Sequence, residues 1–416
     1  MRSFRSTVSQ AGFSIATSAD TLAHLVGLPL PTTLSHLLDA IEREAKVAFF
    51  NIQGPDVIVL NNFSDTVAVR LAIPKGQYVV FGKVSLKNAD GDAQNATARL
   101  TSQAGFNIID QTDIRVGRDE GILHSVNFES TNSISLQGAF TADNGGEIVD
   151  IRCATFLGNV SLASLIAITT ENLAVTTAAP PLVQLRNFQD TVVARVTLQR
   201  GRYVVFGKVV LSNLDGDTQS ARVQLAARDG GIILKENSVL LEHLPNGNSQ
   251  SILILGTATV EDSAYIVDLR CATFDGEARQ ISLVAIAVDD LRVGDSRDGD
   301  DGLGGFVLSQ IDDMHKGNHV LFGSLSIANF DTDDQGAIAS LSSQPGTNVI
   351  DRTTIFLGEA GSGGNNQAVA LQGVVNIAGD GESVKLSFTT IEGNVVKDTP
   401  TLIAIGVVNT RRSPAL

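Results

Sequence analysis

An acidic turn that recurs three times along the chain is the sequence feature best suited to chemistry. Three oxygen-bearing side chains at alternate positions resemble the first half of a calcium-binding loop. No glutamate follows at a fixed distance, and Asn/Asp-Gly is also common chemistry for a tight hairpin turn. Calcium is therefore the one cofactor that the sequence suggests, with a plain turn as the alternative. The nine candidate ligands are Asn88, Asp90, Asp92, Asn213, Asp215, Asp217, Asn329, Asp331 and Asp333.

Residues for catalysis form no recognisable set in the sequence. The six histidines do not recur from copy to copy, and neither a Gly-x-Ser-x-Gly motif nor a phosphate-binding loop occurs. The net charge of −15, without Lys/Arg clusters, disfavours nucleic acid as a partner. No apolar run approaches the roughly 20 residues that a membrane helix needs. We therefore expect a protein that is not an enzyme, binds no nucleic acid and does not span a membrane.

The two cysteines occupy equivalent positions in two copies of one motif. Cys153 and Cys271 are both followed by Ala-Thr-Phe, and the third copy has Phe388 at this place. A position that accepts either Cys or Phe is typical of a packed core. We expect buried free thiols rather than a disulfide or a metal site.

Each acidic turn follows a strand-like stretch of the form Gly-x-Tyr-x-x-Phe-Gly, with His319 in place of the tyrosine in the third copy. Successive side chains of a strand point to opposite faces of the sheet, and in these stretches both faces carry apolar residues. An ordinary sheet with one face in water would have polar residues on that face. Glycine in mid-strand costs stability unless a backbone or ring approaches closely. We predict that six residues pack between domains: Phe81, Phe206, Phe322, Gly82, Gly207 and Gly323.

Self-similarity over roughly 110 residues predicts three tandem domains rather than a short-period solenoid. Abundant Gly and short Val/Ile-rich runs favour an all-β fold. Pro180-Pro181 and the Asp/Gly-rich stretch near residue 300 are typical of exposed linkers. The expected division is a segment at 1–54, repeat 1 at 55–173, a linker at 174–185, repeat 2 at 186–291, a linker at 292–305, and repeat 3 at 306–411.

The first 54 residues have a different pattern from the rest. Leu34, Leu37, Leu38 and Ile41 follow a helical period, with Pro31 just before them. This segment is expected to form a helix that either lies on the first domain or docks the protein to an assembly. The first residues lack the apolar stretch of a signal peptide, so we expect synthesis in the cytosol, with the protein later being part of an extracellular or virion particle.

The repeated motif resembles the Gly-x-Tyr-x-x-Tyr-x-x-Val-x-Phe strand of the tumour-necrosis-factor and C1q-like superfamily. The resemblance covers the three repeats and not the first 50 residues. It implies ten-stranded jelly-roll domains that assemble as threefold clusters through apolar outer faces. It also implies that both ends of each domain lie close together, so that short linkers favour a pseudo-trimer within one chain.

The expected fold is thus three tandem jelly-roll β-sandwich domains after a short helical N-terminal segment. The expected function is that of a structural or recognition protein, in which a trimer-like head is docked to a larger assembly. A phage-like particle, a contractile injection system or a surface filament would fit, with other subunits or copies of itself as partners and a glycan or surface receptor as target. The alternative is a stand-alone carbohydrate- or calcium-dependent binding module.

Overall fold

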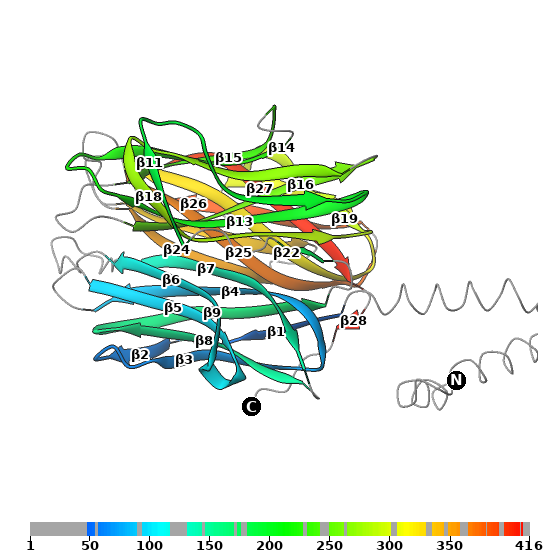
Figure 1. The fold of residues 1–416 in the computed structure, drawn as a ribbon. Helices are drawn as coiled ribbons and strands as arrows, with labels where there is room; N and C mark the ends of the chain where they lie inside the picture. The colour runs from blue at the N-terminus through cyan, green and yellow to red at the C-terminus, as the bar shows by residue number, and fades with distance from the viewer. Residues whose placement is uncertain are drawn as a thin grey trace, which may run out of the picture.

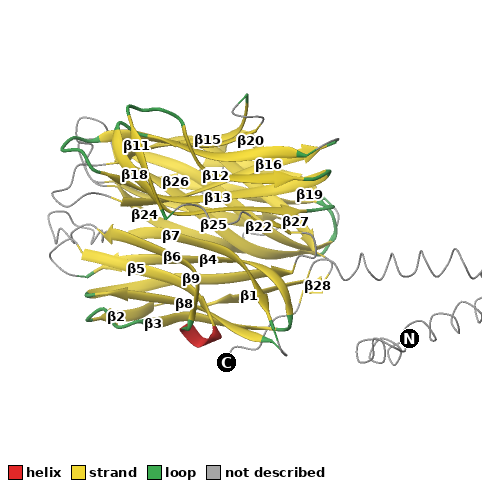
Figure 2. Ribbon diagram, in the orientation of Figure 1, coloured by secondary structure: helices red, strands yellow, loops and turns green. Residues whose placement is uncertain are grey.

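The computed structural model describes residues 48–54, 57–89, 94–116, 131–143, 146–169, 173–175, 181–227, 231–241, 249–261, 264–300, 306–329, 335–344, 348–357, 365–379, 381–390, 395–407 and 409–410. Almost all of these residues lie in strands (Figure 2). One short 3-10 helix, η1 (Gln103–Gly105), also occurs among them. None of the described helices is long and apolar enough to cross a membrane.

The first domain is a sandwich of two antiparallel sheets. Successive strands from β3 to β9 cross repeatedly between the sheets, which is the strand order of a jelly roll. The inner sheet has the order β1 (Ala48–Gln53), β9 (Leu157–Thr169), β4 (Gly76–Asn88), β7 (Thr131–Ala142), with β2 (Val57–Asn61) also paired to β9. The outer sheet has the order β3 (Thr66–Ile73), β8 (Glu147–Thr155), β5 (Gln94–Ser102), β6 (Asn107–Val116).

The second domain repeats this order strand for strand, with β13 in the place of β4. Its inner sheet contains β10 (Leu173–Val175), β11 (Leu182–Arg186), β18 (Asp275–Ala287), β13 (Gly201–Asn213) and β16 (Ser249–Val260). Its outer sheet contains β12 (Thr191–Leu198), β17 (Tyr265–Ala272), β14 (Gln219–Ala227) and β15 (Ile232–Leu241). In Figure 1 these green strands lie above the blue and cyan strands of the first domain.

The third domain follows the same plan, and the expected fold of three tandem jelly-roll β-sandwich domains is therefore confirmed. Its inner sheet contains β19 (Leu291–Val293), β27 (Val395–Val407), β22 (Gly317–Asn329) and β25 (Asn365–Ile377). Its outer sheet contains β20 (Asp295–Asp300), β21 (Phe306–Met314), β26 (Glu382–Thr390), β23 (Gln335–Gln344) and β24 (Asn348–Leu357).

Each sandwich encloses its own apolar core, built from the inward-facing residues of both sheets. Cys153, Cys271 and Phe388 lie in the three cores at equivalent places, and both cysteines are free and buried. Burial raises the pKa of both thiols, so they stay protonated. The prediction of buried core thiols is confirmed.

The start of the central strand is held by the same contact in domains 1 and 3. The Tyr78 hydroxyl donates a hydrogen bond to the Pro74 carbonyl oxygen at 2.9 Å. In the third domain Nε2 of His319 lies 2.8 Å from the carbonyl oxygen of His315, again four residues earlier. Because the imidazole reaches the same carbonyl position, the change from tyrosine to histidine preserves this anchor.

The described parts of the two expected linkers lie mostly in strands, so their assignment as exposed connections is corrected. Within 174–185, β10 and β11 pair with β18 at the edge of the second domain's inner sheet. Within 292–305, β19 pairs with β27 and β20 pairs with β21, both in the third domain. Edge strands are short and tolerate Pro, Gly and charged residues, which gives them the composition of a linker.

The expected N-terminal segment also needs a correction at its end. Residues 48–53 form β1, an inner-sheet strand of domain 1 that pairs antiparallel with β9. On its other side β1 pairs in parallel with β28 (Asn409–Thr410), so the last described strand of the chain joins the first domain (Figure 1). The helix expected around Leu34, Leu37, Leu38 and Ile41 lies outside the described residues.

The mid-strand glycines face the core of their own sandwich, so their assignment to the packing between domains is corrected. A Cβ atom on Gly207 would lie 2.8 Å from Cδ1 of Leu269 and 2.9 Å from Cγ2 of Ile254, both in domain 2. Gly82 would likewise meet Ile151, and Gly323 would meet Leu341. Large side chains of each domain's own core, rather than another domain, occupy the space that the glycine leaves.

We expect Gly207→Val to destabilise the protein by about 1–3 kcal/mol, because two further methyl groups would overpack this contact. Gly216→Val provides the control, since nothing lies within 4 Å of a Cβ atom there. Urea unfolding of both variants measures the difference. Equal stability of Gly207→Val and wild type would show that β13 is not covered as described.

Candidate functional site

The inner sheets of the three domains meet at one apolar cluster in the middle of the molecule. Its residues come from the second face of β4, β13 and β22 and from neighbouring strands of each domain. The rings of Phe81, Phe206 and Phe322 pack on one another, with centroid separations of 4.5, 4.8 and 4.8 Å. All three side chains are at most 2% exposed. One phenylalanine from each domain thus occupies a quasi-threefold centre.

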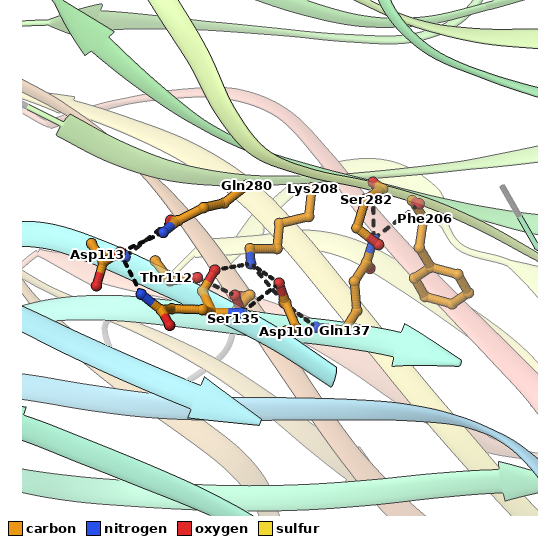
Figure 3. Close-up of polar contacts among 10 residues, drawn as sticks. Asp110, Thr112, Asp113, Ser135, Gln137, Phe206, Lys208, Gln280 and Ser282 are labelled. Atoms are coloured by element: carbon orange, nitrogen blue, oxygen red, sulfur yellow. Dashed lines mark hydrogen bonds and ion pairs between the residues drawn. The ribbon is translucent and has the colours of Figure 1, made fainter. Parts of the chain in front are cut away.

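A buried ion pair joins domain 2 to domain 1. The Nζ atom of Lys208 on β13 lies 2.7 and 2.6 Å from the two carboxylate oxygens of Asp110 on β6, and it also donates to the Gln111 carbonyl oxygen (Figure 3). The lysine side chain is fully buried. Burial lowers the pKa of Lys208 and raises that of Asp110, and contact with the opposite charge partly offsets both shifts.

Two glutamines complete this interface with hydrogen bonds. The Gln137 amide nitrogen on β7 donates to the carbonyl oxygens of Phe206 and Ser282 at 3.2 Å each. The Gln280 side chain on β18 exchanges a pair of hydrogen bonds with Asp113, donating to its carboxylate and accepting from its backbone N–H (Figure 3). These hydrogen bonds satisfy buried donors and acceptors of both domains, although the side-chain oxygen of Gln137 has no hydrogen-bond partner.

The interface between domains 3 and 1 repeats this chemistry. The Nζ atom of Lys83 lies 2.7 and 2.6 Å from the carboxylate oxygens of Asp351 on β24. The Gln372 amide nitrogen donates to the carbonyl oxygens of Phe81 and Ser164. Burial lowers the pKa of Lys83, with the Asp351 carboxylate acting in the opposite direction.

The interface between domains 2 and 3 has different residues at the same places. Ser324 stands where the other domains have Lys83 and Lys208, because it follows Gly323 in the equivalent strand. The position of Gln137 and Gln372 is held by Leu255, which joins the central apolar cluster. A side-chain hydrogen bond from Ser326 to Asn237 connects the two domains.

The acidic turn that the structure describes in full is built around a buried asparagine. The Asn213 amide nitrogen donates to the carbonyl oxygens of Asp217 and Leu241, and its amide oxygen accepts from the Asp215 backbone N–H. Gln219 donates to the Asp215 carboxylate at 2.7 Å. These hydrogen bonds are those of a turn that is held by an asparagine side chain.

The other acidic turns are described only in part. Asn88 and Asn329 are buried like Asn213. Asp90, Asp92, Asp331 and Asp333 lie outside the described residues. Within the described part of the chain no group of three or more His, Cys, Asp or Glu side chains is placed to hold a metal ion.

A pair of aromatic side chains recurs at one end of domains 1 and 2. Phe63 packs on Phe156 with ring centroids 6.1 Å apart, and Phe188 packs on Phe274 at 5.2 Å. Phe63, Phe156 and Phe274 are each about half exposed, at 55%, 47% and 58%. Phe63 and Phe188 adopt left-handed φ angles of +54° and +55°, which cost a non-glycine residue about 1–2 kcal/mol.

A charged side chain covers the aromatic pair of domain 2. Arg222 lies over the Phe188 ring at 5.4 Å and pairs with Asp190 at 2.7 Å. In domain 1 Arg152 pairs with Asp65 at 3.2 Å. The end of domain 2 therefore presents an exposed aromatic surface beside hydrogen-bonding groups, and in domain 1 Asp65 follows Phe63 by two residues.

A buried aspartate between two arginines stabilises the outer sheets of the same two domains. Asp268 accepts hydrogen bonds from Arg195 at 2.6 Å and from Arg270 at 2.8 Å. Asp150 is held in the same way in domain 1, whereas domain 3 has Lys385 at this place. Burial alone would raise the pKa of Asp268, but the hydrogen bonds from Arg195 and Arg270 outweigh it and hold the pKa below its ordinary value.

We expect Asp268→Asn to lower stability at pH 7 by about 1–3 kcal/mol, because two arginine donors lose their charged acceptor. A carboxyl whose pKa is lowered by folding contributes stability above its unfolded value of about 3.9, and loses it as the pH falls through the folded value. The gap between wild type and variant should therefore narrow below about pH 4. Urea unfolding at a series of pH values measures the gap, and the exposed Asp217→Asn is the control. A gap that stays constant with pH would contradict this role of Asp268.

The sequence pattern predicted the phenylalanines of the interfaces between domains but not the acidic and amide side chains that pair across them. The repeated motif drew attention to Phe81, Phe206 and Phe322, which the structure places together. Asp110 and Asp351 were missed, although the shared pattern Asn-Ile/Val-Ile-Asp at 107–110 and 348–351 was available as a signal. The glutamines and the aromatic pairs were also missed, because neither stands out by type or spacing. The proposed docking residues Leu34, Leu37, Leu38 and Ile41 lie outside the described residues.

Comparison with known proteins gives only distant structural likeness. No protein-family model matches the chain, and no curated protein matches it in sequence. The N-terminal CBM22-1-CBM22-2 tandem domain of Xyn10C from Paenibacillus barcinonensis is 10% identical, with 56% of this chain and 92% of that chain covered, at a TM-score of 0.18. The STIV MCP is 10% identical, with 57% and 97% covered, at a TM-score of 0.20. The strand order, not either likeness, defines the fold.

Proposed function

We propose that this chain is a non-enzymatic structural or recognition protein whose three domains form one trimer-like head docked to a larger assembly. The packing of Phe81, Phe206 and Phe322 at one centre carries this proposal. It shows that the apolar inner faces of the three domains are buried against one another within one chain. Buried ion pairs also connect domain 1 to domain 3 and domain 2 to domain 1. A rigid head of this kind leaves the loop ends, and the outer-sheet strands that do not line an interface, for recognition.

The pairing of β1 with β28 supports a single attachment point. The first and last described strands lie side by side at the edge of domain 1 (Figure 1). The described part of the chain therefore begins, at Ala48, on this edge. We propose that the preceding segment, with Leu34, Leu37, Leu38 and Ile41, docks the head to other subunits of a particle or to copies of itself.

Deletion of residues 1–45 tests this proposal without removing β1. We expect the shortened protein to melt at the wild-type temperature, because all of the described strands remain. In cells of the native source, the full chain should sediment with large particles while the shortened chain stays in the supernatant. Co-sedimentation of both proteins, or of neither, would contradict a docking role for the segment.

The exposed aromatic pairs favour carbohydrate binding as a second candidate function. An aromatic face beside hydrogen-bonding groups suits the apolar face and hydroxyl groups of a sugar ring. The same pair recurs in domains 1 and 2, with a strained phenylalanine in each case. This repetition at an energetic cost is the observation that supports binding at these ends.

Affinity electrophoresis in gels that contain soluble polysaccharides tests this second candidate. We expect at least one polysaccharide to retard the wild type, and the double variant Phe156→Ala/Phe274→Ala to migrate as in an empty gel. Phe106→Ala is the control, because Phe106 is 86% exposed and belongs to neither pair. The candidate fails if no polysaccharide retards the wild type or if the double variant is retarded equally.

A further inference from the structure

Two positions at each interface between domains can be compared because the strand registers of the three domains coincide. The first position is held by Lys83, Lys208 and Ser324 in domains 1, 2 and 3. Within its own domain each of these residues is the register partner of a residue on the last inner strand, just before a register shift: Ser164, Ser282 and Thr401, respectively. The second position pairs with a leucine of the neighbouring outer strand just before another shift. This second position is held by Asp110, Lys235 and Asp351, whose register partners within their own domains are Leu100, Leu225 and Leu341.

The observed ring brings the first position of one domain to the second position of another. Lys208 of domain 2 meets Asp110 of domain 1. Lys83 of domain 1 meets Asp351 of domain 3. The third interface places β22 of domain 3 against β15 of domain 2, where the two positions hold Ser324 and Lys235. In this order each buried lysine at the first position has an aspartate, and each aspartate has a lysine.

The opposite order of the domains would fail at two interfaces. It would bring Lys83 to Lys235, which puts two positive charges together. It would also bring Asp110 to Ser324, which leaves a buried carboxylate without a cation. Removal of one partner from a buried ion pair is strongly destabilising, because it leaves an uncompensated charge in the interior. Each wrong interface is therefore strongly disfavoured.

Association of like domains from different chains would also fail for two of the three domains. Three copies of domain 2 would bring Lys208 to Lys235 at every interface. Three copies of domain 3 would bring Asp351 to Ser324 and bury three unpaired carboxylates. Only domain 1, with Lys83 and Asp110, carries a self-complementary set.

We propose that these two positions form a recognition code, by which each domain accepts one particular neighbour from its own chain and domains 2 and 3 reject copies of themselves. Buried ion pairs add little net stability compared with apolar packing but can specify which surfaces pair. Such a code has a clear use during folding, because three similar domains with exposed apolar faces are prone to exchange between chains.

Two variants of the full chain test the code. Ser324→Lys places a second lysine beside Lys235, and we expect it to lower the melting temperature. The double variant Lys235→Asp/Ser324→Lys turns this into a third Lys–Asp pair, and we expect the melting temperature to recover. Failure of the first change to destabilise, or of the second to rescue, would show that positions 324 and 235 do not face each other.

Refolding distinguishes a code from simple pairing. In Lys235→Asp/Ser324→Lys every domain carries the same lysine and aspartate, so every domain fits every other. We expect this variant, refolded from urea, to give species of two or more chain masses whose share grows with protein concentration, while wild type gives one-chain species. The control Ser220→Lys/Lys316→Asp makes the same charge changes at exposed positions and should refold like wild type. Refolding of the first double variant to one-chain species at all concentrations would overturn the proposal.

Discussion

Replacement of Phe206 by alanine is expected to destabilise the protein by about 3–5 kcal/mol, among the largest effects of any single substitution. The side chain is fully buried and lies against both Phe81 and Phe322, so its removal opens a cavity that borders all three domains. Three rigid sheets surround this cavity, which limits the relaxation that could refill it. Urea unfolding measures the loss.

The exposed Phe106 provides the matched control for this substitution. Phe106→Ala removes the same group from a side chain that is 86% exposed, and we expect a change within about 0.5 kcal/mol. A loss below about 1 kcal/mol for Phe206→Ala would mean that the three rings do not form a shared core.

Replacement of Lys208 by methionine is expected to cost about 3–5 kcal/mol as well, for an electrostatic reason. Methionine fills much of the same volume, so the packing changes little. The carboxylate of Asp110, however, stays buried and loses its cation, keeping only the backbone donors of Gln111 and Gln137. The free energy of unfolding in urea is again the measurement.

The double variant Lys208→Met/Asp110→Leu separates the loss of the pair from the cost of an unpaired charge. Both partners become apolar, and we expect stability to return to within about 1 kcal/mol of wild type. If the double variant is as unstable as Lys208→Met, the cost comes from packing and not from the buried carboxylate of Asp110.

The jelly-roll domains and their central strands could be predicted because repetition shows which positions are equivalent. Phe81, Phe206 and Phe322 were assigned to inter-domain packing since they lie on a second apolar face of a strand that is already apolar on the first. The glycines next to them were assigned to the wrong contact. A mid-strand glycine indicates that another group approaches the backbone closely, but it does not show on which face of the strand. At Gly207 the approaching group is the side chain of Leu269 from the same domain.

The partners across the interfaces could not be predicted from local pattern. Lys83 and Asp351 are separated by 268 residues, and the three domains do not all use the same pair. Ser324 and Lys235 occupy the same backbone positions as the lysines and aspartates of the ion pairs, but they differ from them in charge. Repetition of the sequence therefore predicts the backbone position and not the charge of the side chain. Edge strands such as β10 and β19 were missed because short edge strands and exposed linkers have similar compositions.

The native mass of the purified full chain, measured by light scattering, tests most directly the claim that three domains satisfy one another within one chain. We expect a species of one chain mass, 43.7 kDa. In that state Phe81, Phe206 and Phe322 of a single chain meet at the centre. A species of three chain masses would instead show that each domain packs against its counterparts in other chains.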